Sequence, residues 1–218
     1  MNDSIEYTEE IPEEKAEMDR YEDWFSNITE KEQEAWDFAK EKHKAQIRRF
    51  INLPYFDAHV QKVNGIVKQY TKDEDLLIAA LLHDVVEDCY DNKWHGYKDI
   101  KSLFGKRVAE LVMELTSDDD EIGHRYDNSK TNYLIHKMIK MSDDALIIKL
   151  SDRLQNISDA FTASERFRNR YFEETSRIIK SLEDGRGLNQ THKRLVHNIQ
   201  VKLDNISSIF KIKRFDDI

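Results

Sequence analysis

Residues that break helices are scarce in this chain, because its 218 residues include six glycines and two prolines. Folds built from many short strands need glycine and proline far more often at their turns, as do flexible linkers. Helical signals are frequent instead: Thr29 and Glu32 form a capping box, and Gly105 follows an amphipathic segment as a helix stop. The sequence therefore predicts an all-α fold, and its length fits one domain with short extensions.

Apolar residues at helical spacing give the approximate positions of the helices. We expect helices over residues 29–50, 54–70, 74–88, 95–104, 106–116, 130–141, 143–161, 165–182 and 191–210. Residues 117–129 read SDDDEIGHRYDNS and are expected to form a polar loop. Ser142 is expected to cap the helix that begins at residue 143.

The charge balance bears on the class of partner. The chain has 34 Lys and Arg against 43 Asp and Glu, a net charge of −9, which disfavours binding to nucleic acid. Residues 1–28 carry much of the acidic excess and are expected to be a solvated extension. The alternative is a short helix that docks through Trp24 and Phe25 on the core or on a second subunit.

Cysteine content and hydropathy indicate the compartment. Cys89 is the single cysteine, so an internal disulfide is excluded and a cytoplasmic location is expected. Since no apolar run approaches ~18 residues and the amino terminus is acidic, neither a membrane span nor a signal peptide is expected. The sequence leaves the oligomeric state open.

The run LLIAALLHDVVED, residues 76–88, combines an apolar helix with four ionisable side chains: His83, Asp84, Glu87 and Asp88. Burying such groups without partners costs several kcal/mol each, so they must be paired or bind a cation. The adjacent His83 and Asp84 can offer one nitrogen and one oxygen to a single divalent metal. The alternative is a solvated face with salt bridges, which the flanking apolar residues disfavour.

Two other apolar helices each offer a further ligand. His59 lies on the apolar stripe that follows PYFDA, and Asp152 ends the run ALIIKLSD. A lone histidine on such a stripe is more often a core residue, so only the other candidate ligands support a metal-binding role for His59. With His83 and Asp84 these residues form a set of two nitrogens and two oxygens, which suits Mn²⁺, Fe²⁺ or Zn²⁺.

The ordered set H…HD…D resembles the signature of the HD superfamily of metal-dependent phosphohydrolases. Longer stretches resemble the hydrolase domain of the RelA/SpoT alarmone enzymes: HKAQIRRFINLPYFDAH, HDVVED, FGKRVAELVMELT, IKLSDRLQN and RYFEETSRIIKSL. The resemblance covers about residues 35–182, in order and with compatible spacing. The length is most similar to that of the stand-alone small alarmone hydrolases, including the animal type that hydrolyses ppGpp or NADPH.

The resemblance implies an HD-domain helical bundle and a role for particular residues. It implies metal ligands at His59, His83, Asp84 and Asp152, catalysis by Glu87 and Asp88, and substrate binding by Arg48, Arg49, Asn156 and Tyr171. It divides the chain into the acidic extension 1–28, a hydrolase domain of residues 29–185 and a helical carboxy-terminal extension, 186–218. Guanidinium groups match phosphate oxygens in bidentate geometry, so the basic run around residue 48 suits a pyrophosphate.

The activity implied is that of a Mn²⁺-dependent guanosine 3′,5′-bis(diphosphate) 3′-pyrophosphohydrolase, which releases pyrophosphate and leaves GDP. One alternative is an HD phosphohydrolase that acts on the 2′-phosphate of NADPH or on another nucleotide. A second alternative is a catalytically silent alarmone-binding protein. The intact H…HD…D set and the Glu87–Asp88 pair argue against the silent form.

Overall fold

The computed structural model describes residues 28–126 and 129–210. Its regular elements are helices, together with one isolated β-bridge between Ile47 and Pro54. They are α2 Glu30–Lys42, a π-helical turn η1 Phe56–Val60, α3 Gln61–Lys68, α4 Glu74–Leu81, α5 Val85–Cys89, α6 Lys93–Phe104, α7 Lys106–Leu115, α8 Asp119–Arg125, α9 Lys130–Lys140, α10 Asp143–Ala160, α11 Glu165–Gly185 and α12 Gln190–Phe210. The predicted all-α fold is confirmed. Trp24 and Phe25, and with them the question of docking, lie outside the described residues.

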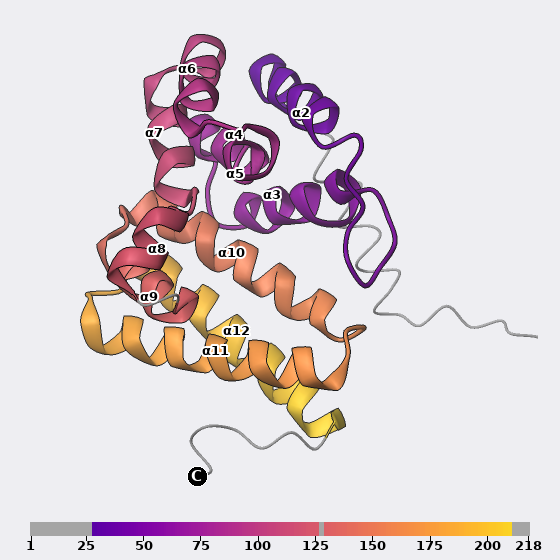
Figure 1. The fold of residues 1–218 in the computed structure, drawn as a ribbon, viewed down its shortest axis with the longest axis vertical. Helices are drawn as coiled ribbons and strands as arrows, with labels where there is room; N and C mark the ends of the chain where they lie inside the picture. The colour runs from indigo at the N-terminus through magenta and orange to yellow at the C-terminus, as the bar shows by residue number, and fades with distance from the viewer. Residues whose placement is uncertain (1–27, 127–128, 211–218) are drawn as a thin grey trace, which may run out of the picture.

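Helix α10 crosses the middle of the molecule, with α3 and α4 on one side and α11 and α12 on the other (Figure 1). The helix begins where expected, because the Ser142 hydroxyl accepts a hydrogen bond from Ala145 N at 3.2 Å. The carboxylates of Asp143 and Asp144 in its first turn interact favourably with the positive end of the helix dipole. Since α10 packs against neighbours on both sides, polar side chains along it are held inside the molecule.

Helix α4 forms the centre of the apolar core, as the run 76–82 predicts. Each residue of this run is at least nine-tenths buried, and α4 packs against α2, α3 and α7. The run was expected to continue as one helix to residue 88, but α4 ends at Leu81 and α5 begins at Val85. The His83 side chain bonds to Ala80 O at 2.8 Å and so competes for a carbonyl that a continued helix would use.

The segment around HKAQIRR is not helical, and the expected helix over 29–50 is wrong in its last turns. Helix α2 ends at Lys42, and residues 43–55 form a hairpin-like loop in which Arg48 N donates to Leu53 O at 2.8 Å. Phe50 and Asn52 adopt positive φ angles of 72° and 59°. The side chains of Ile47, Phe50 and Leu53 stay exposed, so hydrogen bonds across the loop hold this segment in place of a buried helical face.

Two further segments differ from expectation. Residues 54–70 were expected as one helix, yet η1 precedes α3, and π-helical turns are frequent at functional sites. Residues 117–129 were expected as a loop, but α8 occupies part of them. Asp118 caps α8 by accepting from Glu121 N at 3.1 Å, and Ile122 anchors it against the core.

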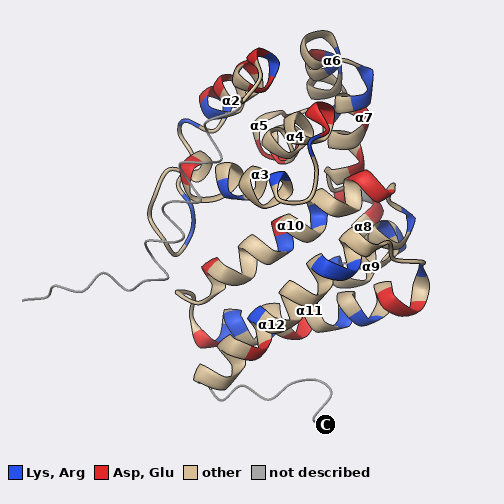
Figure 2. Ribbon diagram, turned by 180° about the vertical axis from the view of Figure 1, so that it is seen from behind, with Lys and Arg blue, Asp and Glu red and all other residues tan. Residues whose placement is uncertain are grey.

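The surface of the described helices carries mixed charge. Lys and Arg alternate with Asp and Glu along α2 and α11 (Figure 2). Among the helices in residues 28–126 and 129–210, none has an apolar stretch long enough to cross a bilayer. Helix α12 lies along α10 and contributes apolar side chains to the core: Leu195, Val196, Ile199, Leu203 and Ile206.

Candidate active site

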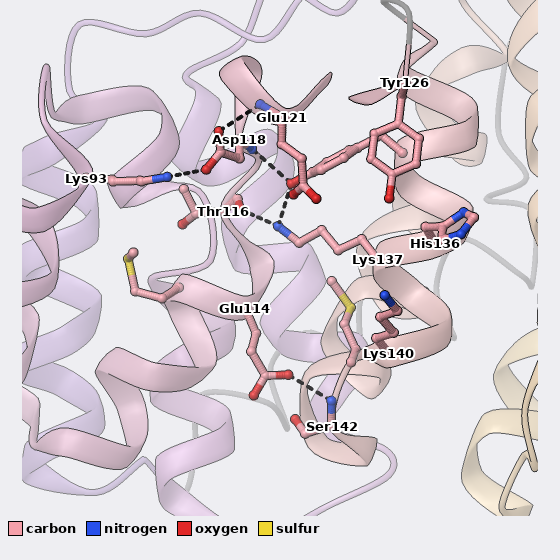
Figure 3. A pocket seen from close by; sticks show the side chains of 13 residues that line it. Lys93, Glu114, Thr116, Asp118, Glu121, Tyr126, His136, Lys137, Lys140 and Ser142 are labelled. Carbon is pink, nitrogen blue, oxygen red and sulfur yellow. Dashed lines mark hydrogen bonds and ion pairs between the residues drawn. The ribbon is translucent and has the colours of Figure 1, made fainter. Parts of the chain in front are cut away.

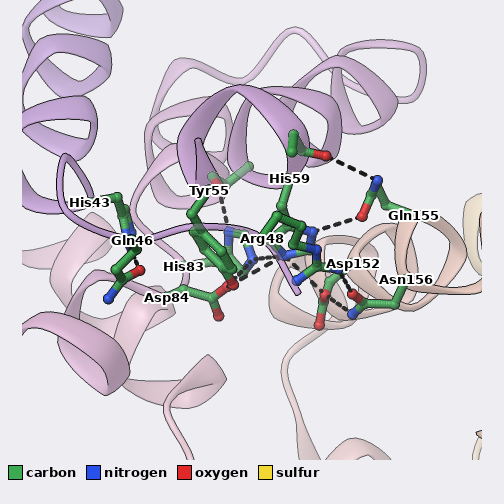
Figure 4. Close-up of polar contacts among 12 residues, drawn as sticks. His43, Gln46, Arg48, Tyr55, His59, His83, Asp84, Asp152, Gln155 and Asn156 are labelled. Atoms are coloured by element: carbon green, nitrogen blue, oxygen red, sulfur yellow. Dashed lines mark hydrogen bonds and ion pairs between the residues drawn. The ribbon is translucent and has the colours of Figure 1, made fainter. Parts of the chain in front are cut away.

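The side chains of the four predicted metal ligands meet at one point between α4 and α10 (Figure 4). His59 comes from η1, His83 and Asp84 from the turn between α4 and α5, and Asp152 from α10. The Nε2 atoms of His59 and His83 are 3.2 Å apart. Asp84 Oδ2 lies 3.3 Å from His59 Nε2 and 3.0 Å from His83 Nε2. Asp152 Oδ1 lies 3.5 Å from His59 Nε2.

The hydrogen bonds on the far side of each imidazole fix its tautomer. His83 Nδ1 donates to a backbone carbonyl of α4. Gln155 Nε2 donates to Asp159 Oδ1 at 2.9 Å and to Ala58 O at 3.3 Å, so its amide oxygen must face His59. His59 Nδ1 therefore donates to Gln155 Oε1 at 2.7 Å. Both Nε2 atoms therefore face the cluster, and in the neutral ring each offers a lone pair to a cation there.

This arrangement fits a divalent cation. Two imidazole nitrogens and two carboxylates face one another in a largely buried space, and a divalent cation can bind all four groups at once. Burial alone would raise the pKa of Asp84, but His83 and His59 hold it well below its usual range. Burial alone would lower the pKa of His83, yet the carboxylates of Asp84 and Asp152 raise it to about 9.

The acidic pair lies one turn beyond the ligands, on α5, and its side chains reach solvent. Glu87 Oε2 accepts a hydrogen bond from Ser117 N at 2.8 Å, which ties the carboxylate to the end of α7. Loss of hydration against the protein, together with the charges of Asp84 and Glu87, raises the pKa of Asp88 to about 6. A carboxyl group with this pKa can exchange a proton near neutral pH.

Two of the predicted substrate residues lie directly beside the ligands. Arg48 Nε donates to Asp159 Oδ2 at 2.8 Å, and its Nη2 donates to Asn156 Oδ1. Asn156 Nδ2 in turn donates to Asp152 Oδ1 at 2.5 Å. The loop that replaces the expected helix thus directs Arg48 inward, where its side chain is 15% exposed.

The other two predicted substrate residues make contacts with aromatic rings. Arg49 is exposed, and its guanidinium carbon is 5.0 Å from the centroid of the Phe50 ring. Tyr171 stacks on Phe167 at 5.9 Å, and Phe167 also contacts Phe50 at 4.8 Å. Burial raises the pKa of Tyr171 to about 12, although the nearby guanidinium of Arg153 lowers it. These rings form an aromatic surface between the loop and α11.

Several residues at the site were not predicted from the sequence. The Tyr55 hydroxyl donates to Asp84 Oδ2 at 2.6 Å, and Lys149 Nζ lies 2.9 Å from Asp152 Oδ2. Gln155 and Asp159 form the hydrogen bonds described above. Lys149, Asp152, Gln155 and Asp159 recur every three or four residues, so the polar stripe on α10 is the signal that could have identified them.

A pocket of about 660 Å³ opens beyond the acidic pair, between the end of α7, α8 and α9 (Figure 3). Lys137 Nζ donates to Thr116 O, next to the Ser117 amide that holds Glu87. Burial, with the charge of Lys149, lowers the pKa of Lys137 to about 8. The amine of Lys137 thus binds the residue next to Ser117, whose amide holds the Glu87 carboxylate.

Comparisons with known proteins give the family. The chain is 32% identical over 180 residues to the guanosine-3′,5′-bis(diphosphate) 3′-pyrophosphohydrolase MESH1 of Drosophila melanogaster, covering 79% of this chain and 90% of that one. It is 34% identical over 153 residues to a guanosine-3′,5′-bis(diphosphate) 3′-pyrophosphohydrolase of Aquifex aeolicus, and the match covers 69% of this chain and 20% of that relative. The chain is also 32% identical over 176 residues to the bifunctional (p)ppGpp synthase/hydrolase SpoT of Escherichia coli, and this match covers 79% of this chain and 23% of SpoT. The chain thus spans about a fifth to a quarter of the two bacterial relatives.

A solved structure and a family model agree with these relatives. The structure described as a metazoan ortholog of SpoT that hydrolyses ppGpp superposes with a TM-score of 0.67 at 30% identity, covering 86% of this chain and 99% of that one. The model of the HD domain matches residues 35–187, a range that includes all four predicted metal ligands. The chain therefore belongs to the HD-domain family, whose members are metal-dependent phosphohydrolases.

Proposed function

We propose that this protein hydrolyses guanosine 3′,5′-bis(diphosphate) at the 3′ position, with Mn²⁺ as the metal, and releases pyrophosphate and GDP. One observation carries the proposal: a buried His59–His83–Asp84–Asp152 cluster lies between a basic residue, Arg48, and an acidic pair. Two relatives that match 153 and 180 residues are named for this reaction. We place the reaction in the cytoplasm, where Cys89 stays reduced.

The cluster would hold the cation through His59 Nε2, His83 Nε2 and one oxygen each of Asp84 and Asp152. A divalent cation supplies Lewis-acid activation of water and of a phosphoryl group. The protein residues do the rest. Tyr55 and Asn156 donate to the two ligand carboxylates and so hold them in place before substrate arrives.

The acidic pair performs the proton transfers in this proposal. Water adds across the bond between the ribose 3′ oxygen and phosphorus, so one proton must leave the water and one must reach the 3′ oxygen. Asp88, whose pKa is about 6, can accept the first proton and return it to the leaving oxygen. Glu87, whose carboxylate is held by Ser117 N, orients the attacking water beside Asp88.

Arg48 is the phosphate-binding residue. Asp159 and Asn156 use its Nε and one N–H of Nη2, and the N–H groups at the Nη1 end extend beyond those bonds. These groups match two oxygens of a pyrophosphate in bidentate geometry. The guanidinium thus neutralises charge on the pyrophosphate, which is transferred to water.

Product analysis tests the function directly. The full chain, loaded with Mn²⁺, is given ppGpp, NADPH or GDP in separate assays, and pyrophosphate and orthophosphate are measured separately. We expect pyrophosphate and GDP from ppGpp in equal amounts, and neither with Asp84→Asn. Orthophosphate from NADPH without pyrophosphate from ppGpp would replace our proposal with a 2′-phosphatase activity. Binding of ppGpp without any product would show a silent alarmone-binding protein.

A further inference from the structure

One face of α10 carries four polar residues at helical spacing: Asp152, Gln155, Asn156 and Asp159. They occupy positions i, i+3, i+4 and i+7, so they follow one another along the same side of the helix. Gln155 is 3% exposed and Asp159 is 7% exposed, although both are polar. Buried polar groups of this kind require complete hydrogen bonding, which makes the partners of this stripe informative.

The first path along the stripe joins a metal ligand to the phosphate-binding arginine. His59 Nδ1 donates to Gln155 Oε1, and Gln155 Nε2 donates to Asp159 Oδ1. The other oxygen of the same carboxylate, Oδ2, accepts from Arg48 Nε at 2.8 Å. Asp159 therefore uses one oxygen toward the metal cluster and the other toward the substrate side.

A second path runs in parallel. Arg48 Nη2 donates to Asn156 Oδ1, and Asn156 Nδ2 donates to Asp152 Oδ1 (Figure 4). A third link passes through Tyr55, whose ring centroid is 5.4 Å from the guanidinium carbon of Arg48 and whose hydroxyl donates to Asp84. Arg48 is thus connected to three of the four predicted metal ligands. Of the residues that bond to Arg48 in these connections, Asp159 is the carboxylate.

The direction of every bond in the first path follows from the chemistry of Asp159. An ionised carboxylate only accepts hydrogen bonds, so Gln155 must present its NH₂ group to it and its oxygen to His59. The imidazole is then protonated at Nδ1 and keeps its Nε2 lone pair for a metal. The same carboxylate anchors the Nε edge of the guanidinium and leaves the Nη1 end for phosphate.

We propose that Asp159 is a positioning residue that couples the metal centre to the phosphate-binding site. It holds Arg48 in position for substrate and, through Gln155, holds His59 in the tautomer that binds metal. The inference rests on the proposed role of Arg48 but concerns a residue outside the predicted catalytic and binding set. Because one carboxylate supports both sites, its loss weakens metal binding and substrate binding together.

The isosteric change Asp159→Asn tests the coupling, because an amide has one acceptor oxygen and cannot serve both Gln155 and Arg48. We expect Mn²⁺ affinity, measured by calorimetry without substrate, to fall about 10-fold, the low end for loss of an outer-shell partner. We expect KM for ppGpp to rise about 10-fold and kcat to change by less than about 3-fold. A substitution that only loosens the fold would not produce this split.

Asp144→Asn is the matched control. Asp144 lies at the other end of α10, and its carboxylate also accepts from an arginine, Arg107, at 2.8 Å. We expect this variant to keep the Mn²⁺ affinity and the KM of the unmodified chain. An equal effect of the two substitutions would overturn the coupling, since it would then reflect the helix and not the path.

A second variant covers the case in which Asp159→Asn does not fold. Gln155→Met removes the acceptor of His59 Nδ1 while keeping a side chain of similar length, and it should also weaken Mn²⁺ binding about 10-fold. Unchanged Mn²⁺ affinity in the folded variants would overturn the coupling, whatever their activity. Weaker Mn²⁺ binding in a protein that never hydrolyses ppGpp would uphold the coupling to metal and refute the proposed function instead.

Discussion

The two ends of HDVVED, residues 83–88, differ in how firmly the structure holds them. His83 and Asp84 are enclosed by η1 and α10 and take part in several hydrogen bonds and ion pairs. Glu87 and Asp88 reach solvent, and the Glu87 carboxylate is held by the Ser117 amide. The predicted ligands are thus organised by the protein before substrate binds, whereas the acidic pair is open to solvent and one backbone amide holds the Glu87 carboxylate.

The largest effect should come from the enclosed end. Asp84→Ala removes a carboxylate that faces both histidines, so the chain should lose its divalent ion. Turnover should fall about 10³-fold or more, because the metal contributes several kcal/mol to stabilising the transition state. Metal content by mass spectrometry and pyrophosphate release check this, with Asp91→Ala as the exposed control. Normal turnover in Asp84→Ala would contradict the metal-site assignment.

The exposed end should separate metal binding from chemistry. Glu87→Gln combined with Asp88→Asn keeps the shape of both side chains and removes their ability to exchange protons. The variant should bind Mn²⁺ as before, while turnover falls roughly 10²-fold or more, the usual scale for acid–base groups. Single-turnover assays at saturating substrate measure the effect. If turnover is unchanged, the proton transfers belong to other residues, and the comparison between the two ends fails.

Most of the fold followed from the sequence because apolar periodicity and caps act locally. The run 76–82 and the cap at Ser142 are correct for this reason. The loop 43–55 was not predicted, because its hydrogen bonds, such as Tyr55 N to Gln46 O at 2.9 Å, join residues whose pairing no periodicity encodes.

The candidate site was predictable only in part. Ionisable residues within apolar runs, such as His83 and Asp84, stand out because burial would be costly without partners. Gln155 and Asp159 do not stand out, since the part of α10 that follows Ser151 is largely polar and such side chains are typical of a surface. Their spacing from Asp152 marks a polar stripe, but the partners that this face of α10 meets depend on the packing against η1 and the loop.

Arg48 tests whether the organised side of the site extends to substrate. Arg48→Ala should weaken binding of ppGpp by about 10- to 150-fold, the range for a charge-assisted contact of about 1.5–3 kcal/mol. Arg48→Lys should recover only part of this, because lysine offers a point charge without the fork. Inhibition constants of ppGpp and GDP distinguish the two diphosphates. Equal weakening of both would place Arg48 at the 5′ group, and no weakening would remove it from the site.

The pH profile probes the exposed end in a graded way. The pKa of Asp88 is about 6, above its ordinary value, and a nearby cation can only lower it. As pH falls through the pKa of Asp88, which the cation places at or below about 6, the carboxylate becomes protonated and can no longer accept a proton, so kcat should decrease up to about tenfold per pH unit. Asp88→Asn should lack this inflection. A profile that is the same in both proteins would exclude Asp88 as the base.

The smallest effect on substrate binding should come from Arg49→Ala. Arg48 and Arg49 are adjacent in sequence but differ in exposure, like the two ends of HDVVED. Arg48 points inward and pairs with Asp159, whereas Arg49 is exposed beside the Phe50 ring. A solvated arginine contributes through long-range charge alone, so Arg49→Ala should raise KM by about 2- to 5-fold and leave kcat unchanged. Raising the salt concentration should reduce this difference and leave most of the Arg48→Ala effect. If Arg49→Ala weakens binding as much as Arg48→Ala, the loop must rearrange to bring both guanidinium groups to the pyrophosphate.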